Sequence, residues 1–204
     1  MGVTARIATG FPALDVALDG GWPGGTLTEL LVPEQGCGEL GLLSPALARL
    51  TATGDAALAG TGSWVMLITP PWIPYAPGLC WHGVALGRVL IIGIRRPPES
   101  PWATDKSLWA MEEALRSGTC AAVIAWAGTT AIYQARHAQL QRLHFLANKR
   151  NTWAVLIRAA RCRRERSPAR LRLQLRCSSP ATLQLDIFKN GWRGTETVTV
   201  ERRF

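Results

Sequence analysis

The chain has 204 residues, of which 48% are hydrophobic and 9 are tryptophan, so it can bury a core typical of one domain spanning 1–204. No apolar run reaches the roughly 18 residues of a membrane-spanning helix, and the first residues lack the apolar stretch of a signal peptide. We therefore expect a cytoplasmic protein without a membrane partner.

Positive charge is concentrated near the C-terminal end. Residues 1–140 carry 8 Lys and Arg against 10 Asp and Glu, whereas residues 141–204 carry 15 against 4, which gives net charges of −2 and +11. This asymmetry favours an anionic partner, of which nucleic acid is the commonest, although a solvated basic surface is the alternative.

Cysteine and histidine spacing indicates neither a disulfide framework nor a metal site. The number of cysteines is odd and they form no Cys-x-x-Cys pair, and the three histidines show no ligand spacing. We expect reduced thiols and no metal or other cofactor. These residues are Cys37, Cys80, Cys120, Cys162, Cys177, His82, His137 and His144.

The first half of the chain predicts three strands and a helix. Residues 26–32 form a short apolar run, and 39–50 place leucines at helical spacing, with Pro45 expected to kink the helix or make its first turn irregular. Residues 63–71 and 87–94 are typical of buried strands, separated by a loop rich in Pro and Trp.

The middle of the chain continues the alternation of strands and helices. We expect helices at 104–118, ended by Gly118, and at 130–150, with buried strands at 119–127 and 151–160. Such alternation predicts an α/β fold with a mainly parallel, twisted sheet flanked by helices.

The last third has a different periodicity. Residues 171–177, 182–188 and 196–202 alternate apolar and polar side chains, and Asn190-Gly191 is typical of a hairpin turn. We therefore predict antiparallel C-terminal strands, within 171–204, at one edge of the sheet.

The stretch VPEQGCGELGLL, residues 32–43, has the order of a phosphate-binding loop: a strand, glycines and a helix. Such a loop needs a lysine for the terminal phosphates and a Ser or Thr for Mg²⁺. Glu39 and Leu40 occupy those positions, and a like charge beside phosphate should cost several kcal/mol, so we expect a turn kept for its shape. The residues of this degenerate loop (32–40), not expected to bind ATP, are Glu34, Gly36, Gly38, Glu39 and Leu40.

Three segments together resemble RecA. IATGFPALDVALDGGWPGGTLTELLVPEQGCGEL is similar to the RecA segment that runs from a Thr-Gly and Leu-Asp opening to the phosphate loop. ALRSGTCAAVIAW parallels the segment that ends in the metal-orienting aspartate, and ANKRNTWAVLIRAAR parallels the strand before the second DNA-binding loop. The resemblance covers most of the chain and implies a RecA-like, P-loop-type core.

The departures from RecA all affect ATP chemistry. Besides the lost lysine, Ala125 and Trp126 stand where the aspartate is expected, and Pro70, Pro71 and Trp72 occupy the region of the catalytic glutamate. All three elements are absent together, so we expect no enzymatic activity.

Among RecA-like proteins, the chain length, GELGLLSPALARL and the LRSG.C.AV.AW pattern are similar to the ImuA family. The resemblance implies a non-catalytic accessory protein of the translesion DNA synthesis mutasome in the bacterial SOS response. Its implied partners are ImuB, the error-prone C-family polymerase through ImuB, and RecA as a further candidate. The alternatives are a SulA-type cell-division inhibitor that binds FtsZ, which would need no basic loop, and a DNA-dependent ATPase with a substitute cation such as Arg49.

Between Arg158 and Arg176 there are eight arginines and one acidic residue, Glu165. By the resemblance, this basic loop (158–170) corresponds to one that touches single-stranded DNA, and a flexible arginine-rich loop can pair with phosphates. The alternatives are an acidic protein partner or plain surface, with Arg172 and Arg176 on the solvent face of a strand. The candidate contact residues are Arg161, Arg163, Arg164, Arg166 and Arg170.

The stretch PPWIPYAPGLCW, residues 70–81, supplies candidates for protein contact: Trp72, Tyr75 and Trp81. Trp and Tyr are enriched at interface hot spots, although a loop of this composition can also cap a core.

Overall fold

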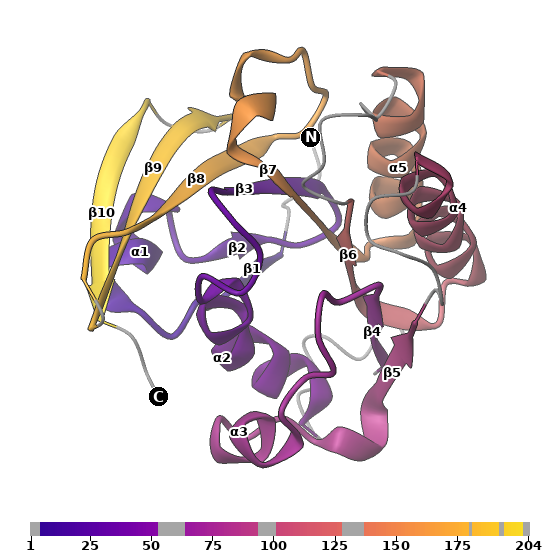
Figure 1. The fold of residues 1–204 in the computed structure, drawn as a ribbon, viewed down its shortest axis with the longest axis horizontal. Coiled ribbons are helices and arrows are strands. Elements are labelled where there is room, and N and C mark those ends of the chain that lie inside the picture. The colour runs from indigo at the N-terminus through magenta and orange to yellow at the C-terminus, as the bar shows by residue number, and fades with distance from the viewer. Residues whose placement is uncertain are drawn as a thin grey trace.

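The computed structural model describes residues 5–52, 64–93, 101–127, 137–179, 181–191 and 194–201, with only the backbone of 101–105. An eight-stranded sheet has the order β10-β9-β8-β3-β7-β6-β4-β5, and β1 pairs with β2 in a separate ribbon (Figure 1). The strands are β1 (Arg6–Ile7), β2 (Trp22–Pro23), β3 (Leu27–Val32), β4 (Trp64–Ile68), β5 (Val89–Ile92), β6 (Cys120–Trp126), β7 (Trp153–Ala159), β8 (Leu171–Cys177), β9 (Thr182–Asn190) and β10 (Glu196–Glu201).

The sheet is mainly parallel, as the alternation of strands and helices predicts. The strands from β3 to β8 pair parallel with one another, while the β8–β9 and β9–β10 pairs are antiparallel. The prediction of antiparallel C-terminal strands is therefore right for β9 and β10 and only half right for β8. After β7 the chain passes over β3 and enters the sheet again as β8 on the far side of β3. The strand β8 therefore pairs parallel with β3 on one side and antiparallel with β9 on the other.

Helices cover both faces of the sheet. In Figure 1, α4 (Pro101–Ser117) and α5 (His137–Arg150) lie side by side on one face, and α1 (Pro12–Ala17) and α2 (Glu39–Thr51) lie on the other. One apolar core joins the sheet to α1 and α2 and includes stacked Trp22 and Trp153, whose ring centroids are 5.5 Å apart. A second core joins the sheet to α4 and α5. Shorter helical turns are α3 (Ala76–Trp81), η1 (Leu86–Arg88) and η2 (Ala160–Arg164).

Four local expectations concern a proline, a glycine, an edge strand and a helix. The helix α2 continues through Pro45, and Gly118, with φ +69°, follows the end of α4 as expected. The strand β5 is at the sheet edge, so Leu90 and Ile91 are exposed rather than buried. Residues 130–136 of the helix expected at 130–150 lie outside the described residues. Within the described part of the chain, no helix is long and apolar enough to cross a membrane.

Candidate functional site

Two turns leave neighbouring strands at the same edge of the sheet. Val32 and Ala159 end the parallel pair β3 and β7, and the chain then enters the glycine turn (33–38) and the arginine segment (160–170), respectively. In open α/β sheets, ligands bind beyond the carboxyl ends of the parallel strands. The degenerate phosphate loop and the basic loop noted in the sequence are therefore both at the edge where such sites form.

The glycine turn is closed by its own glutamate. Gly36 has φ +80° and Gly38, the N-cap of α2, has φ +110°, both in the region that favours glycine. Glu39 begins α2, is only 2% exposed, and its Oε1 accepts the Gly36 N–H at 2.8 Å. A backbone amide at the helix N-terminus, of the kind that binds phosphate, is thus already bonded to a carboxyl group.

The same carboxyl group also joins α2 to β6. The indole N–H of Trp126, the last residue of β6, donates to Glu39 Oε1 at 3.2 Å. The other oxygen, Oε2, is buried and has no hydrogen-bond partner among the described residues. Because a buried polar atom without a partner is energetically costly, a hydrogen-bond donor that reached this oxygen would be stabilised there.

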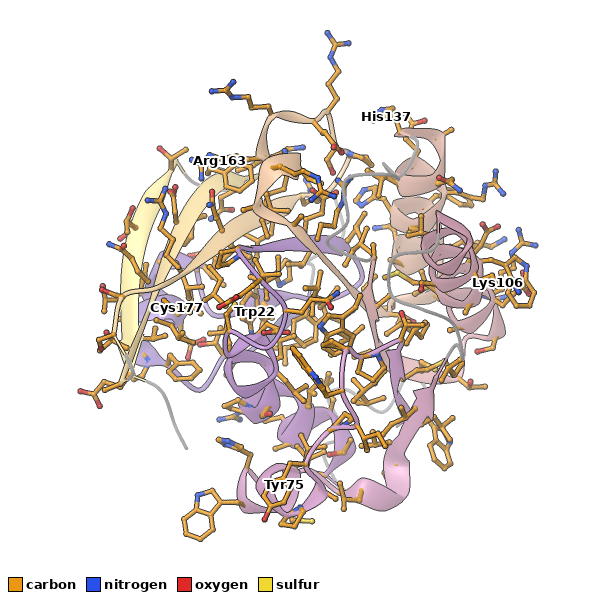
Figure 2. The ribbon with its side chains drawn as sticks, in the orientation of Figure 1. Trp22, Tyr75, Lys106, His137, Arg163 and Cys177 are labelled. Atoms are coloured by element: carbon orange, nitrogen blue, oxygen red, sulfur yellow. The ribbon has the colours of Figure 1, made fainter. Side chains whose placement is uncertain are left out.

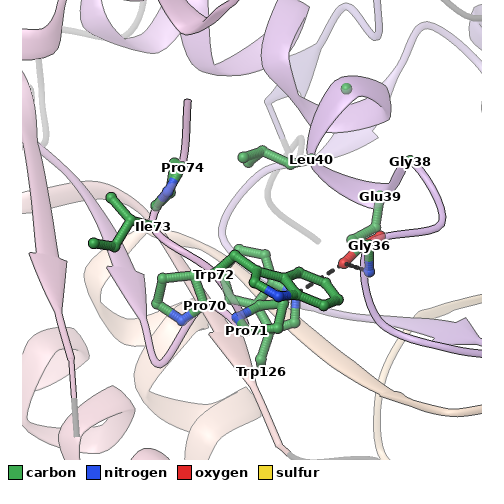
Figure 3. Close-up of a pocket in the computed structure, with 11 residues that line it drawn as sticks. Gly36, Gly38, Glu39, Leu40, Pro70, Pro71, Trp72, Ile73, Pro74 and Trp126 are labelled. Atoms are coloured by element: carbon green, nitrogen blue, oxygen red, sulfur yellow. Dashed lines mark hydrogen bonds between the residues drawn. The ribbon is translucent and has the colours of Figure 1, made fainter. Parts of the chain in front are cut away.

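A cavity of about 160 Å³ lies beside the glycine turn, and Figure 3 shows its lining. The ring of Trp72 lies across Gly36, where an added Cβ would come within 2.4 Å of the ring. Apart from Glu39, the lining consists of glycines, prolines, aliphatic residues and tryptophans. The lining residues are Gly36, Gly38, Glu39, Leu40, Gly41, Pro70, Pro71, Trp72, Ile73, Pro74 and Trp126.

A strained residue directs the segment Pro70–Pro74 over this cavity. Thr69 follows β4 with φ +50°, which is rare for a β-branched residue. Its backbone N–H donates to Ile92 O at 2.7 Å, and its hydroxyl lies 3.0 Å from Trp126 O and 2.8 Å from the Ser107 hydroxyl. Strain held in place by this many hydrogen bonds is typical of functional sites.

Of the predicted loop residues, Gly36, Gly38, Glu39 and Leu40 meet around the cavity, whereas Glu34 is exposed and is not in its lining. Sequence reasoning missed two participants. The first is Trp126, a departure from RecA in the sequence. Its role as a hydrogen-bond donor to Glu39 could not be predicted, because 87 positions of sequence separate the two residues. Nothing in the sequence marks Thr69.

The glycine turn also contains a buried thiol. Burial, Glu39 and Cys177 all raise the pKa of Cys37 far above its ordinary value, so the thiol stays protonated. The Cys177 thiol, at the end of β8, donates to the Cys37 carbonyl oxygen at 3.3 Å. This contact links the turn to the strand that follows the arginine segment.

The arginine segment begins with the helical turn η2, whereas we expected a flexible loop. A buried carboxylate beneath the segment holds it in place. Glu29 in β3 is fully buried, and its oxygens accept from Arg172 Nε at 2.6 Å, Ser167 Oγ at 2.9 Å and Arg158 Nη1 at 3.3 Å. The expectation that Arg172 lines a solvent face is wrong, because Arg172 lies opposite Glu29 in the β3–β8 pair and is buried.

The two buried arginines also fix the backbone of the segment. Arg172 donates to the carbonyl oxygens of Cys162 at 2.9 Å, Glu165 at 3.1 Å and Arg163 at 3.3 Å. Arg158 pairs with the Glu165 carboxylate as well as with Glu29. Although burial opposes the charged form, Glu29 and the other neighbours raise the pKa of Arg158, so this guanidinium acts as an internal cation.

The five predicted contact arginines divide into two groups. Arg161, Arg164, Arg166 and Arg170 are exposed. Arg163 is half-buried, donates to Asp186 at 2.6 Å and to Gln174 at 2.9 Å, and lies 4.3 Å from the centroid of the Phe188 ring (Figure 2). The braced segment therefore presents four of the five guanidiniums to a partner.

The three aromatic candidates form part of an exposed surface. Trp72 is 64% exposed, Tyr75 75% and Trp81 80%, and Ile73 between them is 91% exposed. Figure 2 shows Tyr75 on the outer side of α3, away from the sheet. These residues, hereafter the aromatic patch, do not cap the core; their exposure is typical of interaction surfaces.

Comparisons with known proteins add no assignment. No protein-family model matches the chain, and no curated protein matches its sequence. Within the described residues, no group of three or more His, Cys, Asp and Glu side chains could hold a metal ion.

Proposed function

We propose that this protein is a non-catalytic, RecA-like accessory protein of bacterial translesion DNA synthesis, of the ImuA type. The supporting observation is the convergence of three distant segments around one cavity: Glu39, Pro70–Trp72 and Trp126. The resemblance to RecA assigns these positions to the phosphate-binding lysine, the catalytic glutamate and the metal-orienting aspartate. Their meeting at one site supports that alignment.

The same cavity argues against ATP hydrolysis. Polyphosphate would meet the Glu39 carboxyl group, find the Gly36 amide already bonded, and have to displace the Trp72 ring. Arg49 is no substitute cation, because ten residues of α2 separate it from Glu39 by about 15 Å. The expected role is therefore binding rather than catalysis.

The exposed arginines support an anionic partner, for which we propose single-stranded DNA. Residues 160–170 contain no aromatic side chain on which a base could stack. Binding would therefore be dominated by phosphate contacts, be tolerant of sequence, and weaken steeply with salt. An acidic protein surface could use the same guanidiniums.

The aromatic patch supports a second, protein partner, for which we propose ImuB and, through it, the error-prone polymerase. Clusters of exposed Trp, Tyr and Ile supply most of the binding energy in many interfaces. RecA is the further candidate for this surface.

Capture of the tagged protein from DNA-damaged cells, with nuclease present, tests the proposal. We expect mass spectrometry to identify ImuB with the wild-type chain and a strong loss of ImuB with Tyr75→Ala/Trp81→Ala. Arg49→Ala/Arg142→Ala, which changes exposed residues outside the patch, is the matched control and should retain it. Recovery of FtsZ without ImuB would contradict the proposal.

A SulA-type division inhibitor is the second candidate, because an exposed apolar patch beside a closed nucleotide site suits a protein that only binds another protein. It would make cells filament on overexpression, and this effect would not depend on the arginines. The ImuA-type proposal predicts no filamentation.

A further inference from the structure

We propose that the cavity beside the glycine turn is a receptor for an organic cation, an ammonium or guanidinium group on an alkyl stem. The charge reversal at Glu39 then does more than remove phosphate binding, because it turns an anion site into a cation site. This inference rests on the cavity alone and does not depend on the role in translesion synthesis.

The first argument is the unpaired carboxyl oxygen. Glu39 is only 2% exposed, and its Oε1 accepts hydrogen bonds from the Gly36 N–H and the Trp126 indole N–H. Oε2 has no donor among the described residues. A ligand N–H would satisfy this oxygen, and a charged donor would do so more strongly than a neutral one.

The second argument is the composition of the cavity wall. The indole rings of Trp72 and Trp126 flank Glu39, and aromatic faces attract cations. Pro70, Pro71 and Leu40 complete an apolar wall suited to an alkyl stem. Among the described residues, the lining includes no Lys or Arg that would favour an anion.

The third argument is size and access. A volume of about 160 Å³ is below the roughly 300–1,000 Å³ of pockets for drug-sized ligands, so the cavity suits one group the size of a side chain. Trp72 is 64% exposed while its ring lies across Gly36 (Figure 3). An outward movement of this ring would admit the ligand to Oε2. The cation can come from a lysine or arginine of a bound protein or from a free amine.

Titration with propylguanidinium, followed through the indole N–H signals of Trp72 and Trp126 in NMR spectra, tests this proposal. We expect saturable shifts of both signals, and no such shifts with propylurea, which has the same shape without charge, or with butyrate. Equal responses to propylguanidinium and propylurea, or no saturable response to propylguanidinium, would overturn the proposal.

Two variants locate the site. Glu39→Gln, which keeps an oxygen for the Gly36 N–H, should weaken propylguanidinium binding by about tenfold or more. Trp72→Ala changes an exposed side chain and should also weaken binding, so it keeps the test decisive if Glu39→Gln does not fold. Trp109→Ala, which changes an exposed tryptophan of α4 outside the cavity lining, is the control and should bind normally. Unchanged binding by Trp72→Ala would contradict the proposed site.

The two sources of the cation are separated by comparing a Gly-Arg-Gly peptide with agmatine. Tighter binding of the peptide would identify a protein side chain as the ligand, and tighter binding of agmatine would identify a free amine. Binding of neither, with propylguanidinium also silent, would reject the site.

Discussion

The glycine turn and the arginine segment begin at neighbouring ends of β3 and β7, and each is organised by one buried glutamate, yet the two glutamates are satisfied differently. Glu29 accepts from two guanidiniums and a hydroxyl, whereas among the described residues Glu39 accepts from a backbone amide and an indole, and its Oε2 has no hydrogen-bond partner there. A buried carboxylate with matched cations fixes a backbone, while one without them leaves a capacity to bind.

The difference extends to what each turn presents. The arginine segment uses Arg158 and Arg172 internally and displays Arg161, Arg164 and Arg166 outward. In the glycine turn, the Trp72 ring lies across Gly36, and Gly38 and Glu39 line the cavity, while Glu34 is exposed. One edge of the sheet therefore combines an exposed basic surface with a mainly apolar cavity whose wall includes the buried Glu39.

Removing Glu29 should have the largest effect on stability. Glu29→Ala leaves two buried guanidiniums without their shared carboxylate, and we expect the free energy of unfolding to fall by about 3–5 kcal/mol in urea titrations. Glu112→Ala, which removes a surface partner of Arg116 and Arg142, is the control and should cost less than about 1 kcal/mol. Similar losses for both variants would show that the buried network does not brace the segment.

The exposed arginines should matter for DNA and not for stability. Arg161→Ala/Arg164→Ala/Arg166→Ala should weaken binding of labelled single-stranded DNA by about tenfold or more in anisotropy titrations, and lower the salt slope by about 2. The stability should change by no more than about 0.5 kcal/mol for each exposed site.

The control for this variant removes the same charge elsewhere. Arg49→Ala/Arg116→Ala/Arg142→Ala changes three exposed arginines on α2, α4 and α5, and should leave DNA affinity near the wild-type value. Equal weakening by the two triple variants would mean that net charge, and not the arginine segment, determines the affinity.

A methyl group at Gly36 tests how tightly the glycine turn is closed. Gly36→Ala places a Cβ against the Trp72 ring at φ +80° and should destabilise the protein by about 1–2 kcal/mol. At Gly41 in α2 no atom lies within 4 Å of an added Cβ, so Gly41→Ala should stabilise by about 0.5–1 kcal/mol. If Gly36→Ala is also stabilising, the turn is not closed as described.

Each of the two turns contains a buried thiol, and the stability of the protein at alkaline pH reports on both thiols. Burial is the main cause that raises the pKa of Cys37 and of Cys162, so unfolded thiols ionise near pH 8.5 while the folded ones stay protonated. Their contribution to stability is complete below about pH 8.5 and is lost as pH rises further.

Cys37→Ala should therefore reduce the alkaline loss of stability by about 1 kcal/mol near pH 9.5, measured as the pH dependence of the unfolding midpoint. Cys80→Ala, which removes an exposed thiol outside both turns, is the control variant. Identical pH profiles for wild type and Cys37→Ala would contradict the assignment.

The central strands could be predicted from sequence because β3, β6 and β7 are largely apolar segments that are buried on both faces. The run at β5 has the same composition, but sequence does not tell an edge strand from a central one. The period-two pattern correctly placed Leu171, Leu173 and Leu175 in the core.

The candidate site could be predicted only in part. The glycines and Glu39 form a local motif, so spacing alone identified them. The Glu29–Arg172 pair depends on β8 lying beside β3, and the Glu39–Trp126 bond depends on β6 ending near α2; no local pattern encodes either contact. For this reason the sequence pattern places Arg172 on a solvent face, whereas its side chain is buried in the charged cluster.

The most direct test of the account is to measure ATP binding in the presence of Mg²⁺ through the fluorescence of Trp72 and Trp126, which flank the glycine turn. We predict no saturable change up to about 1 mM ATP, because Glu39 fills the position that phosphate would need. Saturable binding with a Kd below about 100 μM would contradict a closed glycine turn and would restore nucleotide chemistry to this protein.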